Sequence, residues 1–147
     1  MKTRRVLYVD DDACIGRLVK RFFEQHFPTY EMLVTGRAED AISMLRARDG
    51  TPEFPVAVIT DVRLGNGADG SDLVRAIREL YPALRTIAVS AVRSPRDLER
   101  VQRAGVSAFL EKELNLTVFV TRLFDLLQCP TDTLPERNNL PQPRPLQ

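Results

Sequence analysis

The sequence of 147 residues contains one histidine, His26, and two cysteines, Cys14 and Cys129. One histidine excludes a Ser-His-Asp triad and a histidine-rich zinc site. The two cysteines form no motif, which indicates reduced thiols and a cytoplasmic protein. No stretch approaches the ~20 apolar residues of a membrane span, and the start, MKTRRVLYVDDD, turns acidic before a signal-peptide core could form. We therefore expect no membrane association.

An excess of charge of one sign is also missing, because the net charge is +1. This balance favours neither nucleic acid nor a membrane surface as a partner. The length fits one domain, which we place at residues 1–128. Five of the ten prolines fall in the last 18 residues, so residues 129–147 are expected to form a Pro-rich tail. That tail is disordered, lies on the surface, or begins a linker to a further part of a longer protein.

Short apolar, β-branched runs alternate with helical patterns along the chain. Strands are expected at 4–9, 30–35, 55–60, 85–90 and 106–110, and helices at about 12–27, 37–47, 71–80, 95–104 and 115–128. Ser71 and Ser94 are the expected caps of the third and fourth helices. The buried stripe of the first helix is expected to consist of Ile15, Leu18, Val19 and Phe22. This alternation predicts an α/β fold, with a parallel sheet covered by helices on both faces.

Polar residues follow four of the expected strands: Asp10 and Asp11, Asp61, Ser90, and Lys112. The carboxyl ends of parallel strands share one edge, where open α/β sheets bind ligands. Converging carboxylates without histidine or thiolate favour a hard cation such as Mg²⁺, and a lysine with a hydroxyl suits a phosphate. Each residue alone fits a helix cap, a polar strand end or a surface lysine, but together they indicate phosphoryl transfer onto an aspartate.

The motifs that carry these residues resemble the receiver domain of two-component response regulators, from about Arg4 to Leu127. They are VLYVDD with the acidic pair, VITDVRL with Asp61, IAVSA with Ser90, and GVSAFLEK with Phe109 and Lys112. Each motif alone is weak, but their order and spacing together are specific. The resemblance implies a flavodoxin-like (βα)5 sheet of strand order 2-1-3-4-5.

The resemblance also implies the chemistry. Asp61 would take a phosphoryl group from a phosphohistidine on a sensor histidine kinase or histidine phosphotransfer protein, with the receiver catalysing its own phosphorylation and slow dephosphorylation. Asp11, Asp61 and the Arg63 carbonyl would bind Mg²⁺, with Asp10 acting through water. Lys112 would pair with a phosphoryl oxygen. Ser90 and Phe109 would switch the surface formed by 95–104, 106–110 and 115–128, which would bind a downstream protein or a second copy.

Two other readings stay open. A haloacid-dehalogenase-type phosphohydrolase also uses an aspartate and Mg²⁺, and Asp10 and Asp12 imitate its D-x-D motif. It needs an acidic pair on a strand beyond the lysine, which this sequence does not offer. The second alternative is an interaction module with the receiver fold that never turns over phosphate. Modification of Asp10, of Asp61 or of neither by an acyl phosphate distinguishes the three.

Some features depart from the family or concern partners. The loop from Leu64 to Gly70 lacks the usual proline and reaches its glycine one residue later than usual. Arg63 and Val92 are predicted to slow loss of the phosphoryl group by flanking the path of the attacking water. Arg17, Lys20 and Arg21 lie on the helix that docks kinases in this family, and a solvated helix face explains them equally well. Arg96, Arg100 and Arg103 recur at helical spacing and predict a basic docking or dimer surface rather than a DNA reader.

Overall fold

The computed structural model describes residues 4–65, 69–91 and 94–128. Its strands are β1 (Arg4–Val9), β2 (Tyr30–Thr35), β3 (Ala57–Asp61), β4 (Arg85–Ser90) and β5 (Ala108–Glu111). Its helices are α1 (Ala13–His26), α2 (Ala38–Arg48), α3 (Gly70–Leu80), α4 (Pro95–Ala104) and α5 (Leu116–Leu127). The expected tail at 129–147 lies outside the described residues.

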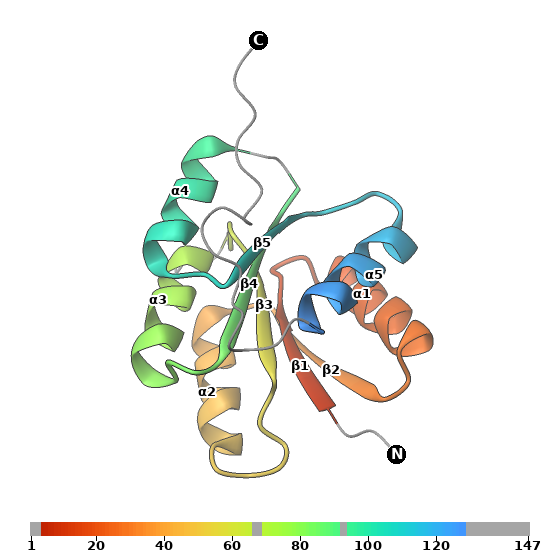
Figure 1. The fold of residues 1–147 in the computed structure, drawn as a ribbon, viewed down its shortest axis with the longest axis horizontal. Helices are drawn as coiled ribbons and strands as arrows, with labels where there is room; N and C mark the ends of the chain where they lie inside the picture. The colour runs from red at the N-terminus through yellow and green to blue at the C-terminus, as the bar shows by residue number, and fades with distance from the viewer. Residues whose placement is uncertain (1–3, 66–68, 92–93, 129–147) are drawn as a thin grey trace.

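All neighbouring strands run parallel in the order β2-β1-β3-β4-β5, with α1 and α5 on one face of the sheet and α2, α3 and α4 on the other (Figure 1). The expected flavodoxin-like fold is therefore confirmed. None of the described helices has the length and apolar character needed to cross a bilayer.

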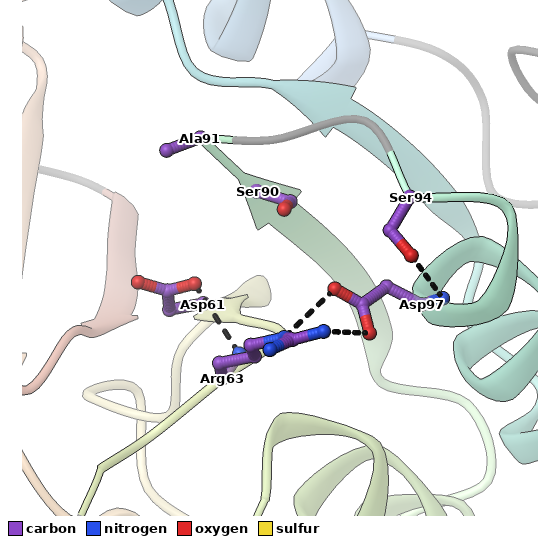
Figure 2. A pocket seen from close by; sticks show the side chains of 6 residues that line it. All are labelled: Asp61, Arg63, Ser90, Ala91, Ser94 and Asp97. Atoms are coloured by element: carbon purple, nitrogen blue, oxygen red, sulfur yellow. Dashed lines mark hydrogen bonds and ion pairs between the residues drawn. The ribbon is translucent and has the colours of Figure 1, made fainter.

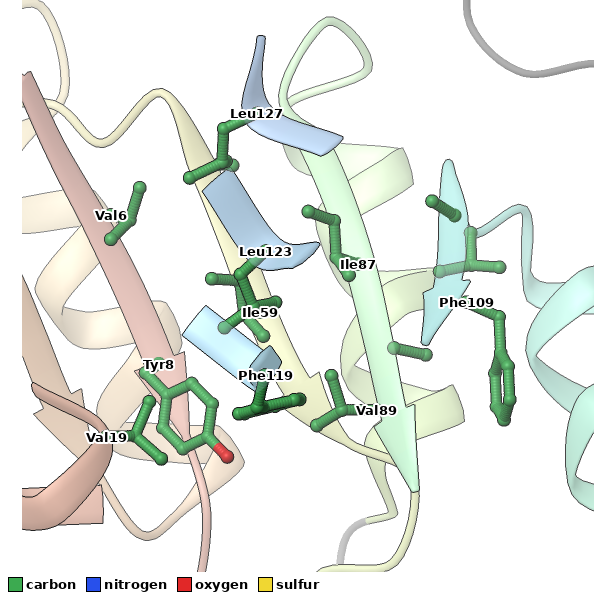
Figure 3. Close-up of a cluster of buried hydrophobic side chains, with 14 of the residues drawn as sticks. Val6, Tyr8, Val19, Ile59, Ile87, Val89, Phe109, Phe119, Leu123 and Leu127 are labelled. Atoms are coloured by element: carbon green, nitrogen blue, oxygen red, sulfur yellow. The ribbon is translucent and has the colours of Figure 1, made fainter. Parts of the chain in front are cut away.

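The sheet is apolar on both faces because helices cover both. In β1, Val6 and Tyr8 point into a cluster with side chains of α1 and α5 (Figure 3), whereas Leu7 and Val9 pack with residues of α2 and α3. This alternation follows from the two-residue repeat of a strand. The continuous hydrophobic run before Asp10 thus buries the strand that carries the acidic pair.

The buried stripe of α1 differs from the one expected. Gly16, Val19 and Phe23 are buried, whereas Leu18 is 41% exposed. The absence of a side chain at Gly16 allows this orientation, because a Cβ there would come within 2.8 Å of a Val34 methyl group. Helix α1 can therefore turn its glycine towards β2, and Leu18 faces outward.

Caps set the starts of the helices. Asp12 and Ser94 accept hydrogen bonds from backbone N–H groups of the first turns of α1 and α4, and Ser94 precedes Pro95 as expected. The expectation for α3 is wrong: Asp69 is the cap and forms a reciprocal capping box with Asp72, while Ser71 is a buried residue inside the helix.

Candidate functional site

The strand registers bring the predicted residues to one edge of the sheet. In the parallel pairing Val9 lies opposite Thr60, and Asp61 lies opposite Val89. The backbone N–H of Lys112 donates to the carbonyl of Ser90 at 2.8 Å, which fixes the lysine beside the end of β4. Asp10, Asp61, Ser90 and Lys112 therefore share the carboxyl rim of the sheet, as the strand ends predicted.

Lys112 bridges two of the aspartates. Its Nζ donates to Asp10 Oδ2 and to Asp61 Oδ2, both at 2.9 Å. Only 18% of the lysine side chain is exposed, and the Asp10 side chain is 1% exposed. The ammonium is therefore held within the carboxylate cluster and is not a surface lysine.

Tyr8 and Asp12 add two further contacts to Asp10. The hydroxyl of Tyr8 donates to Asp10 Oδ2 at 3.2 Å, and the backbone N–H of Asp12 donates to Asp10 Oδ1 at 3.0 Å. Burial, followed by the negative charge of Asp10, raises the pKa of the Tyr8 phenol, which stays protonated as a donor. The sequence analysis missed Tyr8; its only signal was a polar atom on an otherwise apolar strand.

Asp11 occupies the exposed side of the cluster. Its Oδ2 accepts the backbone N–H of Gly65 at 3.0 Å. A Cβ at position 65 would come within 2.8 Å of this oxygen, so the glycine lets the β3–α3 loop approach the carboxylate. The described part of the Gly-rich loop thus orients Asp11, while Asn66 and Gly67 lie outside the described residues.

Helix α3 also approaches the site closely. A Cβ at Gly70 would come within 2.0 Å of the Asp61 carbonyl oxygen, and the Gly70 N–H donates to the Val62 carbonyl at 2.9 Å. Only a residue without a side chain allows this approach. Gly70 therefore brings the first turn of α3 directly onto the backbone of Asp61.

Opposing effects set the charge states of Asp61 and Lys112. Burial raises the pKa of the Asp61 carboxyl and the charge of Asp10 adds to the rise, which outweighs the lowering by Lys112. Burial works to lower the pKa of Lys112, but hydrogen bonds to Asp61 and Asp10 outweigh it and raise the pKa. The lysine is therefore a permanent cation beside carboxylates that repel one another.

The cluster fits a divalent cation. One carboxylate oxygen each from Asp10, Asp11 and Asp61 lies within 4.8 Å of the others. Three carboxylates against the one ammonium of Lys112 leave an excess of two negative charges. Oxygen ligands of this kind are typical of Mg²⁺ sites with few protein ligands. The acidic triad is thus a candidate Mg²⁺ site.

A pocket of about 330 Å³ opens beside Asp61 and is lined by Asp61, Arg63, Ser90, Ala91, Ser94 and Asp97 (Figure 2). Ser90 ends β4 and is 5% exposed. Phe109 does not line the pocket: its ring lies in the core on β5 and is 2% exposed (Figure 3). Val92, predicted to flank the path of water, lies outside the described residues.

Arg63 has hydrogen-bond partners at both ends. Its backbone N–H donates to Asp61 Oδ1 at 3.4 Å, and its guanidinium donates to both carboxylate oxygens of Asp97 on α4, at 3.0 and 3.3 Å (Figure 2). The hydrogen bonds to Asp97 raise the pKa of the arginine. The sequence analysis missed this contact, because 34 residues separate the partners and nothing local signals it.

The arginines of α4 do not form the uniform basic stripe expected from their spacing. Arg100 pairs with Asp69, the cap of α3, and its Nη2 donates to Ser71 Oγ at 3.3 Å. Arg103 pairs with Glu99 at 2.6 Å within the helix. Much of the positive charge of this helix is therefore compensated by neighbouring carboxylates.

Comparisons with known proteins agree with this geometry. The response regulator receiver domain family matches residues 6–124. No curated protein matches the chain. Among solved structures, a CheY-like receiver domain protein from Methanospirillum hungatei JF-1 is 23% identical, with a TM-score of 0.71 over 84% of this chain and 93% of the other. The chemotaxis response regulator CheY4 of Vibrio cholerae is 20% identical, with a TM-score of 0.69 over 85% and 98%.

A LuxR-family two-component response regulator from Aurantimonas sp. SI85-9A1 is 23% identical, with a TM-score of 0.71 over 85% of each chain. At these identities the solved structures support the fold, while the family match covers most of the sequence. The chain belongs to the response regulator receiver domain family.

Proposed function

We propose that this protein is a phosphoaccepting response regulator in which Asp61 takes a phosphoryl group from a phosphohistidine. The nitrogen–phosphorus bond of the donor breaks, a bond forms between an Asp61 carboxylate oxygen and phosphorus, and the imidazole leaves with the electron pair. The observation that carries this proposal is the position of Asp61, which touches the Lys112 ammonium at 2.9 Å and also lines the open pocket.

The surrounding residues have distinct roles in this proposal. Asp11, Asp61 and the Arg63 carbonyl would hold Mg²⁺, with Asp10 acting through water. Mg²⁺ neutralises developing charge and aligns the reacting groups when bound. Lys112 would release an aspartate oxygen to pair with the phosphoryl group, and Ser90 would donate to another phosphoryl oxygen. Phe109 is already buried, so we expect phosphorylation to hold the ring inward.

We infer that a histidine kinase or histidine phosphotransfer protein docks beside α1. A groove of about 1100 Å³ runs from the acidic cluster between α1 and the β5–α5 loop. Leu18 and Leu114 line this groove and are 41% and 104% exposed, so a partner that carries apolar side chains fits it. Lys20 contributes less than expected, because its Nζ is held by Glu24 and by the Met32 carbonyl. The output would pass through α4, β5 and α5 to a downstream protein or a second copy.

Acyl-phosphate labelling tests the site. With acetyl phosphate and Mg²⁺, intact mass should show one phosphoryl group, and peptide mapping should place it on Asp61. Asp61→Asn should abolish the label, whereas Asp10→Asn should retain a reduced one. A label on Asp10 would support the phosphohydrolase, although that carboxylate is 1% exposed and holds three hydrogen bonds. A folded wild-type protein that takes no label would instead indicate a pure interaction module.

A further inference from the structure

We propose that Arg63 is a ligand of the phosphoryl group on Asp61, and that Asp97 competes with this group for the guanidinium, so that phosphorylation releases the first turn of α4. This inference rests on the proposed phosphorylation of Asp61. It assigns Arg63 a binding role in place of the steric role expected from its size. It also gives a direct connection between the phosphoacceptor and α4.

The pocket geometry places all three groups around one space. Asp61 and Asp97 line opposite parts of the 330 Å³ pocket, and Arg63 lies between them, as Figure 2 shows. The backbone of Arg63 is tied to Asp61 while its guanidinium reaches Asp97. A phosphoryl group that entered this pocket would therefore come next to an arginine that is already occupied.

The two partners of the ion pair differ in their freedom to move. The Arg63 side chain is 71% exposed, whereas the Asp97 side chain is 3% exposed. An exposed arginine can change its rotamer at little cost, but a buried carboxylate on the first turn of a helix moves only with that helix. Any exchange of partners must therefore be made by Arg63.

Charge permits the exchange, even though Mg²⁺ and Lys112 would neutralise part of the phosphoryl charge. A phosphoryl group carries about −1.5 to −2 charge at neutral pH, against −1 for the Asp97 carboxylate. Arginine forms bidentate hydrogen bonds with either group. Once Arg63 turns to the phosphoryl group, the buried Asp97 carboxylate loses two charge-assisted hydrogen bonds. An unpaired buried carboxylate is unfavourable, so the first turn of α4 moves until water reaches Asp97.

A second contact keeps the rest of α4 in place. Arg100, one turn further along the helix, pairs with Asp69, the cap of α3, and donates a hydrogen bond to Ser71 of that helix; it is not among the residues that line the pocket. If the contact between Arg63 and Asp97 breaks while Arg100 keeps its contact with Asp69, the helix pivots and does not detach. The same contact supplies a matched control, because it is also an arginine–aspartate pair that involves α4.

Beryllofluoride mimics the phosphoryl group, and calorimetric titration with beryllofluoride in the presence of Mg²⁺ tests the competition. Asp97→Asn should tighten binding roughly 3- to 10-fold, because it removes the competitor for Arg63. Arg63→Gln should weaken binding. In the Arg63→Gln background, Asp97→Asn should change affinity less than about twofold, because the guanidinium for which it competes is gone. An equal gain in both backgrounds would mean simple charge repulsion by Asp97 and would overturn the proposal.

Arg100→Gln controls for general loosening of α4 and should leave beryllofluoride affinity within about twofold of wild type. A gain like that of Asp97→Asn would contradict the proposal. Amide hydrogen exchange over residues 94–104 gives an independent readout. In the wild type, beryllofluoride should speed exchange in this segment; unchanged exchange would overturn release of α4.

If Asp97→Asn does not fold, the exchange experiment and the Arg63→Gln titration decide the question, and tighter or unchanged binding by Arg63→Gln rejects the proposal. Labelling separates this proposal from the function on which it rests. A wild-type protein that takes no phosphoryl group on Asp61 rejects both, whereas a labelled protein whose variants all bind beryllofluoride equally rejects only the competition for Arg63.

Discussion

Helices on the two faces of the sheet add different contacts to the apolar packing that they share. Aromatic rings link α1 to α5 and to β2: Phe27, which caps the C-terminus of α1, stacks on Phe124 of α5 with centroids 4.0 Å apart, and Phe23 of α1 packs edge-on against Tyr30 of β2 at 5.5 Å. Helix α4 also buries Leu98 and Val101 in the core, and arginine–aspartate pairs additionally join it to the β3–α3 loop. Aromatic contacts in a core are lost only by unfolding, whereas ion pairs can exchange partners.

The same contrast appears on the two sides of Asp61. Lys112 is a mostly buried cation between buried or half-buried carboxylates, so its position is fixed by the core. Arg63 is an exposed cation on a buried carboxylate, so its position depends on which anion is nearest. The molecule therefore has a rigid side that holds the reacting groups and an adjustable side that can report on them.

The largest expected effect on stability comes from the aromatic contacts of α1. Phe23→Ala should lower the free energy of unfolding by about 3–5 kcal/mol, because a fully buried ring is replaced by a cavity. Denaturant unfolding followed by circular dichroism measures this loss. Phe54→Ala is the matched control on the opposite face, where a partly buried ring contacts Tyr81, and its loss should be roughly half as large. Equal losses would contradict the expectation that the cost follows the burial of the ring.

An intermediate effect is expected where α3 meets Asp61. Gly70→Ala should destabilise the protein by about 1–3 kcal/mol and slow labelling by acetyl phosphate, because the new Cβ would clash with the Asp61 carbonyl. Gly36→Ala is the control, since a Cβ there meets its nearest atom at 3.5 Å, an ordinary contact. If Gly70→Ala left both stability and labelling unchanged, the close approach of α3 would not matter for the site.

The smallest effect is expected from the ion pairs of α4. Arg100→Gln should lower the free energy of unfolding by up to about 1 kcal/mol, and high salt should reduce the difference from wild type. Arg103→Gln, which removes a more exposed pair with Glu99 in the same helix, should cost about 0.3–0.5 kcal/mol. A salt-independent loss in Arg100→Gln would show that packing of the arginine stem, rather than its charge, joins α4 to α3.

Local signals in the sequence predicted most of the fold. The β-branched runs identified all five strands, and the residues at their ends identified Asp10, Asp61, Ser90 and Lys112 as neighbours. The errors came from choices between nearby residues. Leu18 and Gly16 compete for the inner face of α1, and Ser71 and Asp69 compete for the cap of α3; contacts from other elements decide both.

By itself, the sequence determined the strand order, through its resemblance to a family. It also determined which groups gather at the carboxyl rim, because strand ends are local features and a parallel sheet places them together. Only the tertiary structure decided the partners of the long charged side chains. Arg63 and Arg100 each reach carboxylates about thirty residues away. A flexible side chain takes whichever partner the packed elements bring within reach, and no sequence spacing encodes that choice.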